Sequence, residues 1–513
     1  MKKQTIKTVL LSMVIMLTIG GCSKDFLDQP LPGKLTEDEF YKTDADANLA
    51  IIAVYDIMQS DFWNGGWTSM LMLKIMPSDE SNAGGANTGD QPGYQDLDKY
   101  TATPLNDKVS AAWQKCYTAI YRANKIIVKV PADTDIRKRV MAEAKFLRAY
   151  NYFDLVSLWG DVPLVTTDID PGSYPTVGRT PKADVYALIE SDLNDAIAVL
   201  PLKSAYSKAD KFRASKGAAQ ALLGKVYLYE KKWKESADQF ELVINSNEYQ
   251  LASSVGAAFS KAGEFGSESL LEISYSNTLG YDYGNFPWGN TPESNIHVQL
   301  WGPRSDAGYV KAPGDSLLGG WGMNLAKQKL YNAFVAAGDV VRRGQTIMSR
   351  DELIAAGGKF PASGVYDFDG CFQRKYGSFA TQSSTSATAV LELNYGTNWR
   401  FLRYADIVLM AAEANYRLGG ASEVKGLGYL NDLRTHRSLL PSTGLSGNEL
   451  FTAIVKERQL ELAFEGFRYL DLVRWDLAVQ ELGPLGFVKG KHELLPIPNN
   501  DVVTGKLTQN PGY

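Results

Sequence analysis

The chain has 513 residues, a formal net charge of −5, 45% apolar residues and 22% charged residues. These proportions are near the averages of globular proteins, so they argue against a chain that is disordered over most of its length. The acidic balance, together with the lack of a basic block after the N-terminal segment, argues against a nucleic-acid-binding protein.

The first 21 residues have the parts of an export signal, namely a basic start, a short apolar run and small residues before a cleavage point. The apolar run from Val9 to Ile19 is too short to span a bilayer comfortably. Because Cys22 follows two glycines, the segment resembles a bacterial lipoprotein signal, in which this cysteine becomes the lipidated first residue. An ordinary signal peptide is the alternative. We therefore expect residues 1–21 to be removed and several acyl chains on Cys22 to anchor the protein stably.

Residues 22–34 contain two prolines and a glycine, which is typical of a short extended tether. No later apolar stretch approaches the length of about 18 residues that a membrane-spanning helix needs. We therefore expect a soluble body on the membrane surface that begins near residue 35.

Helical periodicity dominates residues 35–250. Thr36–Glu39 has the form of a capping box, which predicts a helix start, and apolar residues recur at helical spacing after it and along residues 113–127. Thr180 and Pro181 are typical of an N-cap and a first-turn proline before another amphipathic helix. Cys116 also lies in an apolar helical pattern, which favours a buried free thiol over a disulfide with Cys371.

Residues 213–246 have the spacing of a tetratricopeptide repeat, which is a helix, a tight turn and an antiparallel helix. The residues that carry this spacing are Leu223, Gly224, Tyr227, Trp233, Ser236 and Phe240. The small residues Gly224 and Ser236 permit a close approach of the two helices, and Tyr227 and Phe240 fill the groove between them.

Other segments look like degenerate relatives of the same helical unit, namely Ala142–Trp159, Arg403–Leu418 and Thr452–Trp475. One repeat cannot bury its own apolar face, so several must stack. The sequence therefore predicts a mostly α-helical protein with a tetratricopeptide-like scaffold of about four helix pairs. Residues 401–513 complete this scaffold, and we assign Trp113, Trp159, Trp233 and Trp475 to its core.

Residues 251–400 differ from the rest of the chain because helical periodicity is mostly lost and glycine, proline, asparagine and aromatic residues take over. A smaller patch of the same kind extends from Asp61 to Tyr100 and includes Trp63 and Trp67. Irregular insertions of this length are usually functional loops or disorder, and disordered segments are poor in aromatic residues. We therefore expect a loop-rich binding region.

Several segments match one family pattern in the same order along the chain. They are LDQPLPGKLTEDEFY, AAWQKCYTAIYRANKII, AEAKFLRAYNYFDLVSLWGDVPLV, GDVVRRGQTI, FLRYADIVLMAAEANYRLG, KERQLELAFEGFRYLDLVRWDL and LLPIPNND. Together they resemble the SusD/RagB family over essentially the whole mature chain. This resemblance implies a surface-exposed, lipid-anchored protein of the cell outer membrane. It also implies a protein that binds an oligosaccharide, or less often a peptide, and delivers it to a SusC-type TonB-dependent transporter.

The resemblance carries scaffold motifs and no ligand motif, so the site must be argued from chemistry. Sugar rings lie against aromatic faces, and their hydroxyls need amide, carboxylate or guanidinium partners. Core anchoring is the alternative for any single aromatic residue in a loop. We predict stacking platforms and hydroxyl partners at Trp288, Trp301, Trp321, Tyr283, Tyr94, Asn82, Asn87 and Arg304.

An enzyme is not predicted, because the chain has no HExxH helix, G-x-S-x-G elbow, P-loop or dinucleotide glycine pattern. Glu457, Glu461 and Glu465 share one helical face, but the nearby arginines favour a structural salt-bridged helix. Asp367–Gly370 resembles the start of a calcium loop without its remaining ligands, so we predict no metal and no cofactor. A surface glycoside hydrolase and a peptide- or protein-binding scaffold lipoprotein remain the alternatives.

Overall fold

The computed structural model describes residues 39–60, 67–169 and 177–513. Cys22, the signal segment and the tether therefore lie outside the described residues, as does most of the predicted capping box at Thr36–Glu39. The first described helix, α3, begins later, at Asp44, and has its own capping box between Thr43 and Asp46. No helix in the described ranges is both long and apolar enough to cross a membrane.

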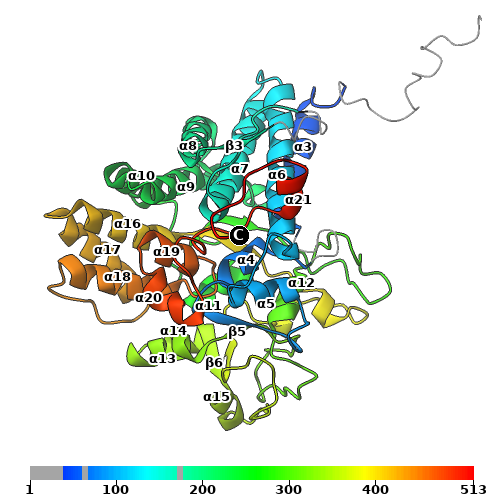
Figure 1. The fold of residues 1–513 in the computed structure, drawn as a ribbon, viewed down its shortest axis with the longest axis vertical. Coiled ribbons are helices and arrows are strands. Elements are labelled where there is room, and N and C mark those ends of the chain that lie inside the picture. The colour runs from blue at the N-terminus through cyan, green and yellow to red at the C-terminus, as the bar shows by residue number, and fades with distance from the viewer. Residues whose placement is uncertain (1–38, 61–66, 170–176) are drawn as a thin grey trace, which may run out of the picture.

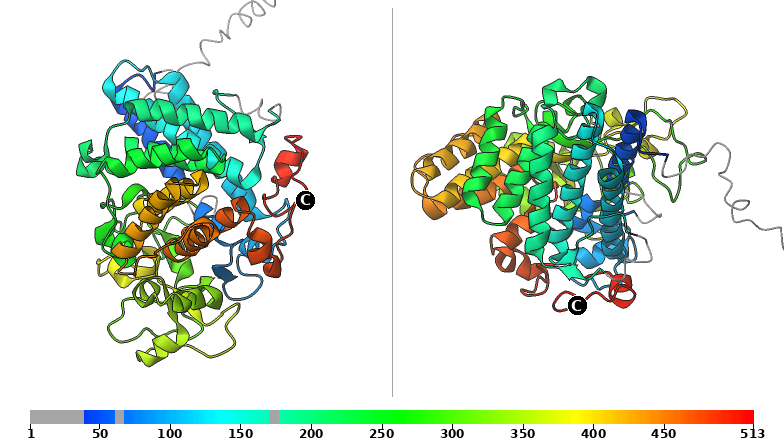
Figure 2. Two further views of the ribbon diagram at one scale, coloured as in Figure 1. Left: turned by 90° about the vertical axis from the view of Figure 1, so that its left-hand side faces the viewer. Right: turned by 90° about the horizontal axis from the view of Figure 1, so that it is seen from above.

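The scaffold is a row of long helices in which each helix packs against the next (Figure 1). In the left view of Figure 2 this row passes from cyan and green helices at the top to orange helices below. The mostly α-helical, tetratricopeptide-like prediction is confirmed. The helices of the row are α3 (Asp44–Gln59), α6 (Asp107–Lys129), α7 (Asp135–Trp159), α8 (Lys182–Val199), α9 (Lys216–Tyr229), α10 (Trp233–Asn245), α16 (Tyr404–Leu418), α17 (Ser422–His436) and α18 (Gly447–Glu461).

The pair α9–α10 packs as its sequence spacing predicts. The Ser236 hydroxyl donates a 2.8 Å hydrogen bond to the Gly224 carbonyl, which ties the two helices together. A Cβ atom added at Gly224 would stand 2.6 Å from Cε1 of the fully buried Phe240. The absence of a side chain at Gly224 is therefore what allows the Phe240 ring to lie against the backbone of α9.

We expect Gly224→Ala to lower the free energy of unfolding by about 1–3 kcal/mol, because the new methyl group overpacks the contact with Phe240. The measurement is the midpoint of urea denaturation. Gly428→Ala is the matched control, since Gly428 lies within α17 and an added Cβ there meets nothing within 4 Å. Alanine should be neutral or stabilising at that position. Equal midpoints for the two variants would contradict the packing argument.

The irregular region lies between α10 and α16, which nevertheless pack directly on each other. Its longest helix has nine residues. In Figure 1 its green and yellow segments lie below and to the right of the helix row. Its helices are α11 (Val255–Phe259), α12 (Ile296–Trp301), α13 (Gln328–Ala336), α14 (Val340–Thr346) and α15 (Arg350–Ala355).

The strands of the described residues form two-stranded antiparallel sheets. They pair β1 (Ser81–Gly84) with β5 (Met323–Ala326), β2 (Val162–Pro163) with β3 (Arg179–Thr180), β4 (Ser269–Ile273) with β8 (Trp399–Arg403), and β6 (Ile347–Ser349) with β7 (Cys371–Gln373). The first of these sheets joins the N-terminal part of the chain to the irregular region.

Short elements complete the fold. The α-helices are α4 (Met70–Ile75), α5 (Pro92–Asp98), α19 (Arg468–Arg474), α20 (Ala478–Leu482) and α21 (Asn499–Val503). The 3₁₀ helices are η3 (Lys203–Ala205), η4 (Lys208–Asp210), η5 (Lys261–Gly263), η6 (Ala380–Gln382), η7 (Leu391–Leu393) and η8 (Gly483–Leu485).

Three details of the sequence predictions can be compared with this fold. Thr452–Trp475, which resembles the helix-pair unit in sequence, contains two helices, because α18 ends at Glu461 and α19 begins at Arg468. Pro181 is itself the N-cap of α8, one residue later than predicted. Cys116 and Cys371 are both buried free thiols, as expected, and burial raises the pKa of the Cys371 thiol to about 12.

Candidate functional site

The β1–β5 ladder brings the N-terminal aromatic patch against the irregular region. Asn82 is paired with Leu325, and the Gly85 amide donates a 2.7 Å hydrogen bond to the Gly322 carbonyl. Beside this ladder, Arg304 donates a 2.8 Å hydrogen bond from Nη1 to the carbonyl of Trp321. Two segments that are far apart in the sequence therefore form one surface.

Trp67 connects the surface around the β1–β5 ladder to the loop between β4 and α12. Its ring centroid lies 5.2 Å from that of Trp321 in an edge-on arrangement, and it also packs against the apolar cluster that contains Phe286. Its backbone has a φ of +47°, a left-handed conformation that is rare for a bulky residue. Strain of this kind concentrates at functional sites. Trp67 was not among the predicted ligand residues, and its only sequence signal was its place in the smaller aromatic patch.

The loop between β4 and α12 presents the most exposed aromatic side chains of the site. Tyr283 is 57% exposed and Trp288 is 45% exposed. The Trp288 ring rests on the buried Phe286, with 4.6 Å between the centroids. Because Phe286 belongs to the cluster that Trp67 also contacts, one buried cluster links the exposed rings to Trp67. We call Tyr283, Trp288, Trp67 and Trp321 together the aromatic surface.

Hydrogen bonds hold this loop in a defined shape. Oδ1 of Asp282 accepts from the amides of Gly284 (2.8 Å) and Asn285 (3.0 Å). At the start of the loop, Asn394 accepts from the Tyr281 amide at 2.8 Å and donates to the Tyr281 carbonyl at 2.7 Å. A preordered loop loses little entropy when it binds a ligand.

Trp301 and Tyr94 are not stacking platforms, and these two predictions are wrong. Trp301 is 1% exposed, stacks on Trp399 at a centroid distance of 4.8 Å, and donates its indole N–H to the Met72 sulfur at 3.0 Å. Tyr94 is fully buried, and its hydroxyl donates to the Trp67 carbonyl at 2.8 Å. Both rings are enclosed by the core, so neither can offer a face to a ligand.

The predicted polar partners have different surroundings. Asn82 is buried and its amide donates to the Asp367 carbonyl at 3.1 Å, so it joins two loops and does not face a ligand, contrary to its prediction. Arg304 is half-buried and forms a 2.6 Å ion pair with Asp306. Asn87 is exposed, with its side-chain oxygen accepting from the Gly89 amide at 2.8 Å. Of these residues, Asn87 and Arg304 remain candidates at the rim of the aromatic surface.

A cleft of about 270 Å³ lies at the base of the same loop, between α3 and β4. Its walls include Asp56, Gln59, Tyr275, Ser276 and Glu293. Gln59 donates to the Glu293 carbonyl at 3.3 Å, and the Tyr275 hydroxyl donates to the Gln59 carbonyl at 2.9 Å. These amide, hydroxyl and carboxylate groups could bind the hydroxyls of a polar ligand that extends from the aromatic rings.

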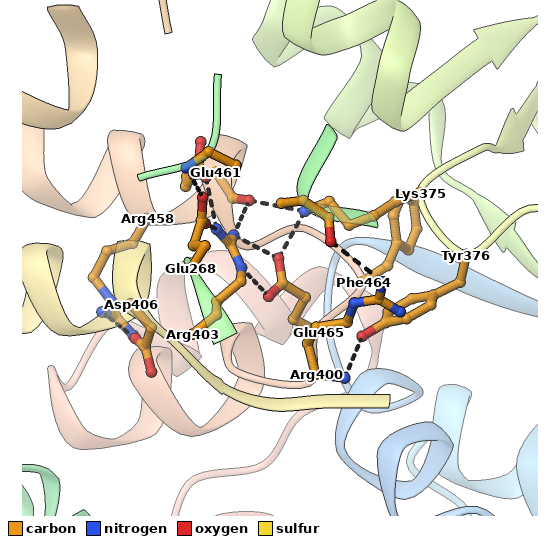
Figure 3. Close-up of polar contacts among 12 residues, drawn as sticks. Glu268, Lys375, Tyr376, Arg400, Arg403, Asp406, Arg458, Glu461, Phe464 and Glu465 are labelled. Atoms are coloured by element: carbon orange, nitrogen blue, oxygen red, sulfur yellow. Dashed lines mark hydrogen bonds and ion pairs between the residues drawn. The ribbon is translucent and has the colours of Figure 1, made fainter. Parts of the chain in front are cut away.

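The carboxylates on the face of α18 are structural, as the sequence predicts. Glu461 is fully buried, and its carboxylate lies 2.8 Å from Arg403 (Figure 3). Its oxygens also lie 2.8 Å from Arg437 and 2.9 Å from Arg342. Burial opposes its ionisation, but the three guanidinium groups together hold the pKa of Glu461 well below its usual range. Glu465 belongs to the same network through Arg403 and Lys375, although it lies beyond the end of α18.

The segment Asp367–Gly370 is held by an ion pair. The Asp367 carboxylate lies 3.2 Å from Nζ of Lys99, which also pairs with Asp98. Among residues 39–60, 67–169 and 177–513, no three histidine, cysteine or acidic side chains are grouped so that they could hold a metal ion.

Known proteins of one family match most of this chain in sequence. A family model described as "Starch-binding associating with outer membrane" matches residues 25–228, and a model described as "SusD family" matches residues 329–513. SusD-like protein P2 of Formosa agariphila is 29% identical, and the match covers 98% of each chain.

Solved structures of SusD-like proteins also have the same fold as this chain. A laminarin binding SusD-like protein is 34% identical and has a TM-score of 0.81 over 92% of this chain and 100% of its own. Surface glycan-binding protein A from Bacteroides thetaiotaomicron, in complex with laminarihexaose, has a TM-score of 0.77 over 91% of this chain and 99% of its own. That protein is only 22% identical, so its likeness shows the fold alone.

Proposed function

This chain belongs to the SusD family, and from that premise we propose that it binds an oligosaccharide at the aromatic surface and delivers it to a TonB-dependent transporter. The observation that carries the binding proposal is the exposed pair Tyr283 and Trp288, held on an ordered loop that the Phe286 cluster links to Trp67. Pyranose rings present C–H faces that pack on such rings, and the polar groups of the neighbouring cleft can bind their hydroxyls.

Laminarin oligosaccharides are the first ligands to test, because the solved relative with 34% identity is named as laminarin binding. Isothermal titration against laminarihexaose, other oligosaccharides and peptides tests the ligand class. Binding without release of shorter products separates a binding protein from a glycoside hydrolase. If no glycan in the panel bound, the sugar proposal would be wrong.

Membrane attachment and transporter delivery are further parts of the proposal. The pattern around Cys22 supports a lipid anchor, and the family supports a SusC-type partner and a position on the outer surface. Labelling cells with a radioactive fatty acid should mark the wild type and leave Cys22→Ser unmarked. Co-purification of the transporter with the wild-type protein tests the partner.

We expect Trp288→Ala to weaken oligosaccharide binding by about 1–3 kcal/mol, by analogy with base stacking on aromatic side chains. Trp288→Phe keeps an aromatic face and should lose less affinity. Leu440→Ala is a control on a distant loop, because Leu440 is also exposed and should not change the affinity. Wild-type affinity in Trp288→Ala would place the binding site elsewhere.

A further inference from the structure

A second groove is present on the helical scaffold, between α6 and α21, which lie beside each other in Figure 1. Its volume is about 510 Å³, within the range of small-ligand sites. Trp113, Tyr117 and Tyr121 line it and follow each other along α6 at spacings of four residues, so they share one face of the helix.

This groove is separate from the aromatic surface. Lys108 lies on the other side of α6, where its ammonium group stands 5.3 Å from the ring centroid of Tyr94. Tyr94 in turn bonds to the Trp67 carbonyl, at the edge of the aromatic surface. Tyr94, which bonds to Trp67, therefore packs on the side of α6 that is opposite the groove.

The rings of the groove are held in place. Trp113 and Tyr117 contact each other with 5.0 Å between centroids, and the Tyr117 hydroxyl donates to the Pro163 carbonyl at 2.9 Å. Tyr121 is 37% exposed, and Nζ of Lys125 stands 5.0 Å from its ring centroid. Trp113 itself is buried, so the ring that the groove offers to a ligand is Tyr121, with the ordered rings of Tyr117 and Trp113 behind it.

Polar groups in the walls indicate the chemistry of the occupant. Gln114 and Asn500 are exposed amides, and Asp501 places a buried carboxylate in the same wall. An apolar partner would cover the exposed amides of Gln114 and Asn500 without hydrogen-bonding them, which is costly. A ring with apolar C–H faces and equatorial hydroxyls matches both the aromatic side and the polar rim.

We propose that the α6–α21 groove is a second oligosaccharide-binding surface, which takes pyranose units of the same class of glycan as the aromatic surface. This inference rests on the proposed function. Two surfaces on one anchored protein would raise the local concentration of a long glycan and slow its escape.

The test is equilibrium dialysis of the mature chain with labelled laminarihexaose, compared among five proteins. The wild type should bind about two oligosaccharides per chain, and Tyr121→Ala and Trp288→Ala about one each. The double variant should bind almost none. Asn500→Ala changes only an exposed amide, so it should fold normally and still weaken the second surface several-fold. Equal urea midpoints for the variants and the wild type check folding.

The outcomes separate the two proposals. If the wild type bound one oligosaccharide and neither Tyr121→Ala nor Asn500→Ala changed its binding, the second surface would be overturned and the proposed function would stand. If Tyr121→Ala kept full glycan binding but lost co-purification of the transporter, the groove would be a protein-docking face, which also overturns the inference. If laminarihexaose did not bind the wild type at all, the laminarin assignment would fail together with the second surface.

Discussion

Glu461→Ala is expected to lower the free energy of unfolding by about 3–5 kcal/mol, because it removes a central carboxylate from a buried ion network. In the wild type, Glu461 pairs with Arg342, Arg403 and Arg437, all of which are buried. The variant would leave three guanidinium groups with fewer negative partners in a region that excludes water. The cost of uncompensated buried charge exceeds what the remaining pairs recover.

Urea denaturation of the purified mature chain measures this loss. The matched control is Lys234→Ala, which breaks the exposed pair between Lys234 and Asp238 on α10. Surface pairs contribute little because water screens them, so the control should keep the wild-type midpoint. A Glu461→Ala midpoint equal to that of the wild type would show that the network does not stabilise the fold.

Trp301→Ala is expected to destabilise the protein by about 3–5 kcal/mol, as large-to-small changes of buried aromatic residues do. The Trp301 ring stacks on Trp399 and lies 5.8 Å from the centroid of Tyr376. Truncation would leave a cavity between the irregular region and β8. The Met72 sulfur would also lose the indole N–H that approaches it at 3.0 Å.

Trp301→Ala also distinguishes a structural role of Trp301 in the core from a role in ligand binding. At a temperature where Trp301→Ala remains folded, its affinity for oligosaccharide should equal that of the wild type, whereas Trp288→Ala should lose affinity and keep its stability. Trp301→Phe should recover part of the stability because it restores a ring in the stack. Weakened binding by a folded Trp301→Ala would return Trp301 to the binding site.

The helical scaffold was the most predictable part of this protein. The spacing of Leu223, Gly224 and Tyr227 against Ser236 and Phe240 specifies a close helix pair, and the structure has that pair with the predicted close approach at Gly224 and Ser236. These signals are local, because they depend on residues that are neighbours along one helix or across one tight turn.

The candidate site was predicted only in outline. The aromatic loops identified the correct region, but Trp288 and Trp301 come from the same glycine-rich segment and have opposite environments. Trp301 is buried because Met72 and Trp399, both far from it in the sequence, close around it. Trp67 was missed for the same reason, since Trp321 and the Phe286 cluster, which it contacts, belong to distant segments.

The amino-acid sequence by itself determined that this protein is a helix-pair scaffold with an aromatic, loop-rich insertion, because periodicity and small-residue contacts act over short distances along the chain. Only the tertiary structure decided which rings face solvent and which carboxylates are enclosed by arginines. Both properties depend on which distant segments pack together, and the composition of a single loop does not contain that information.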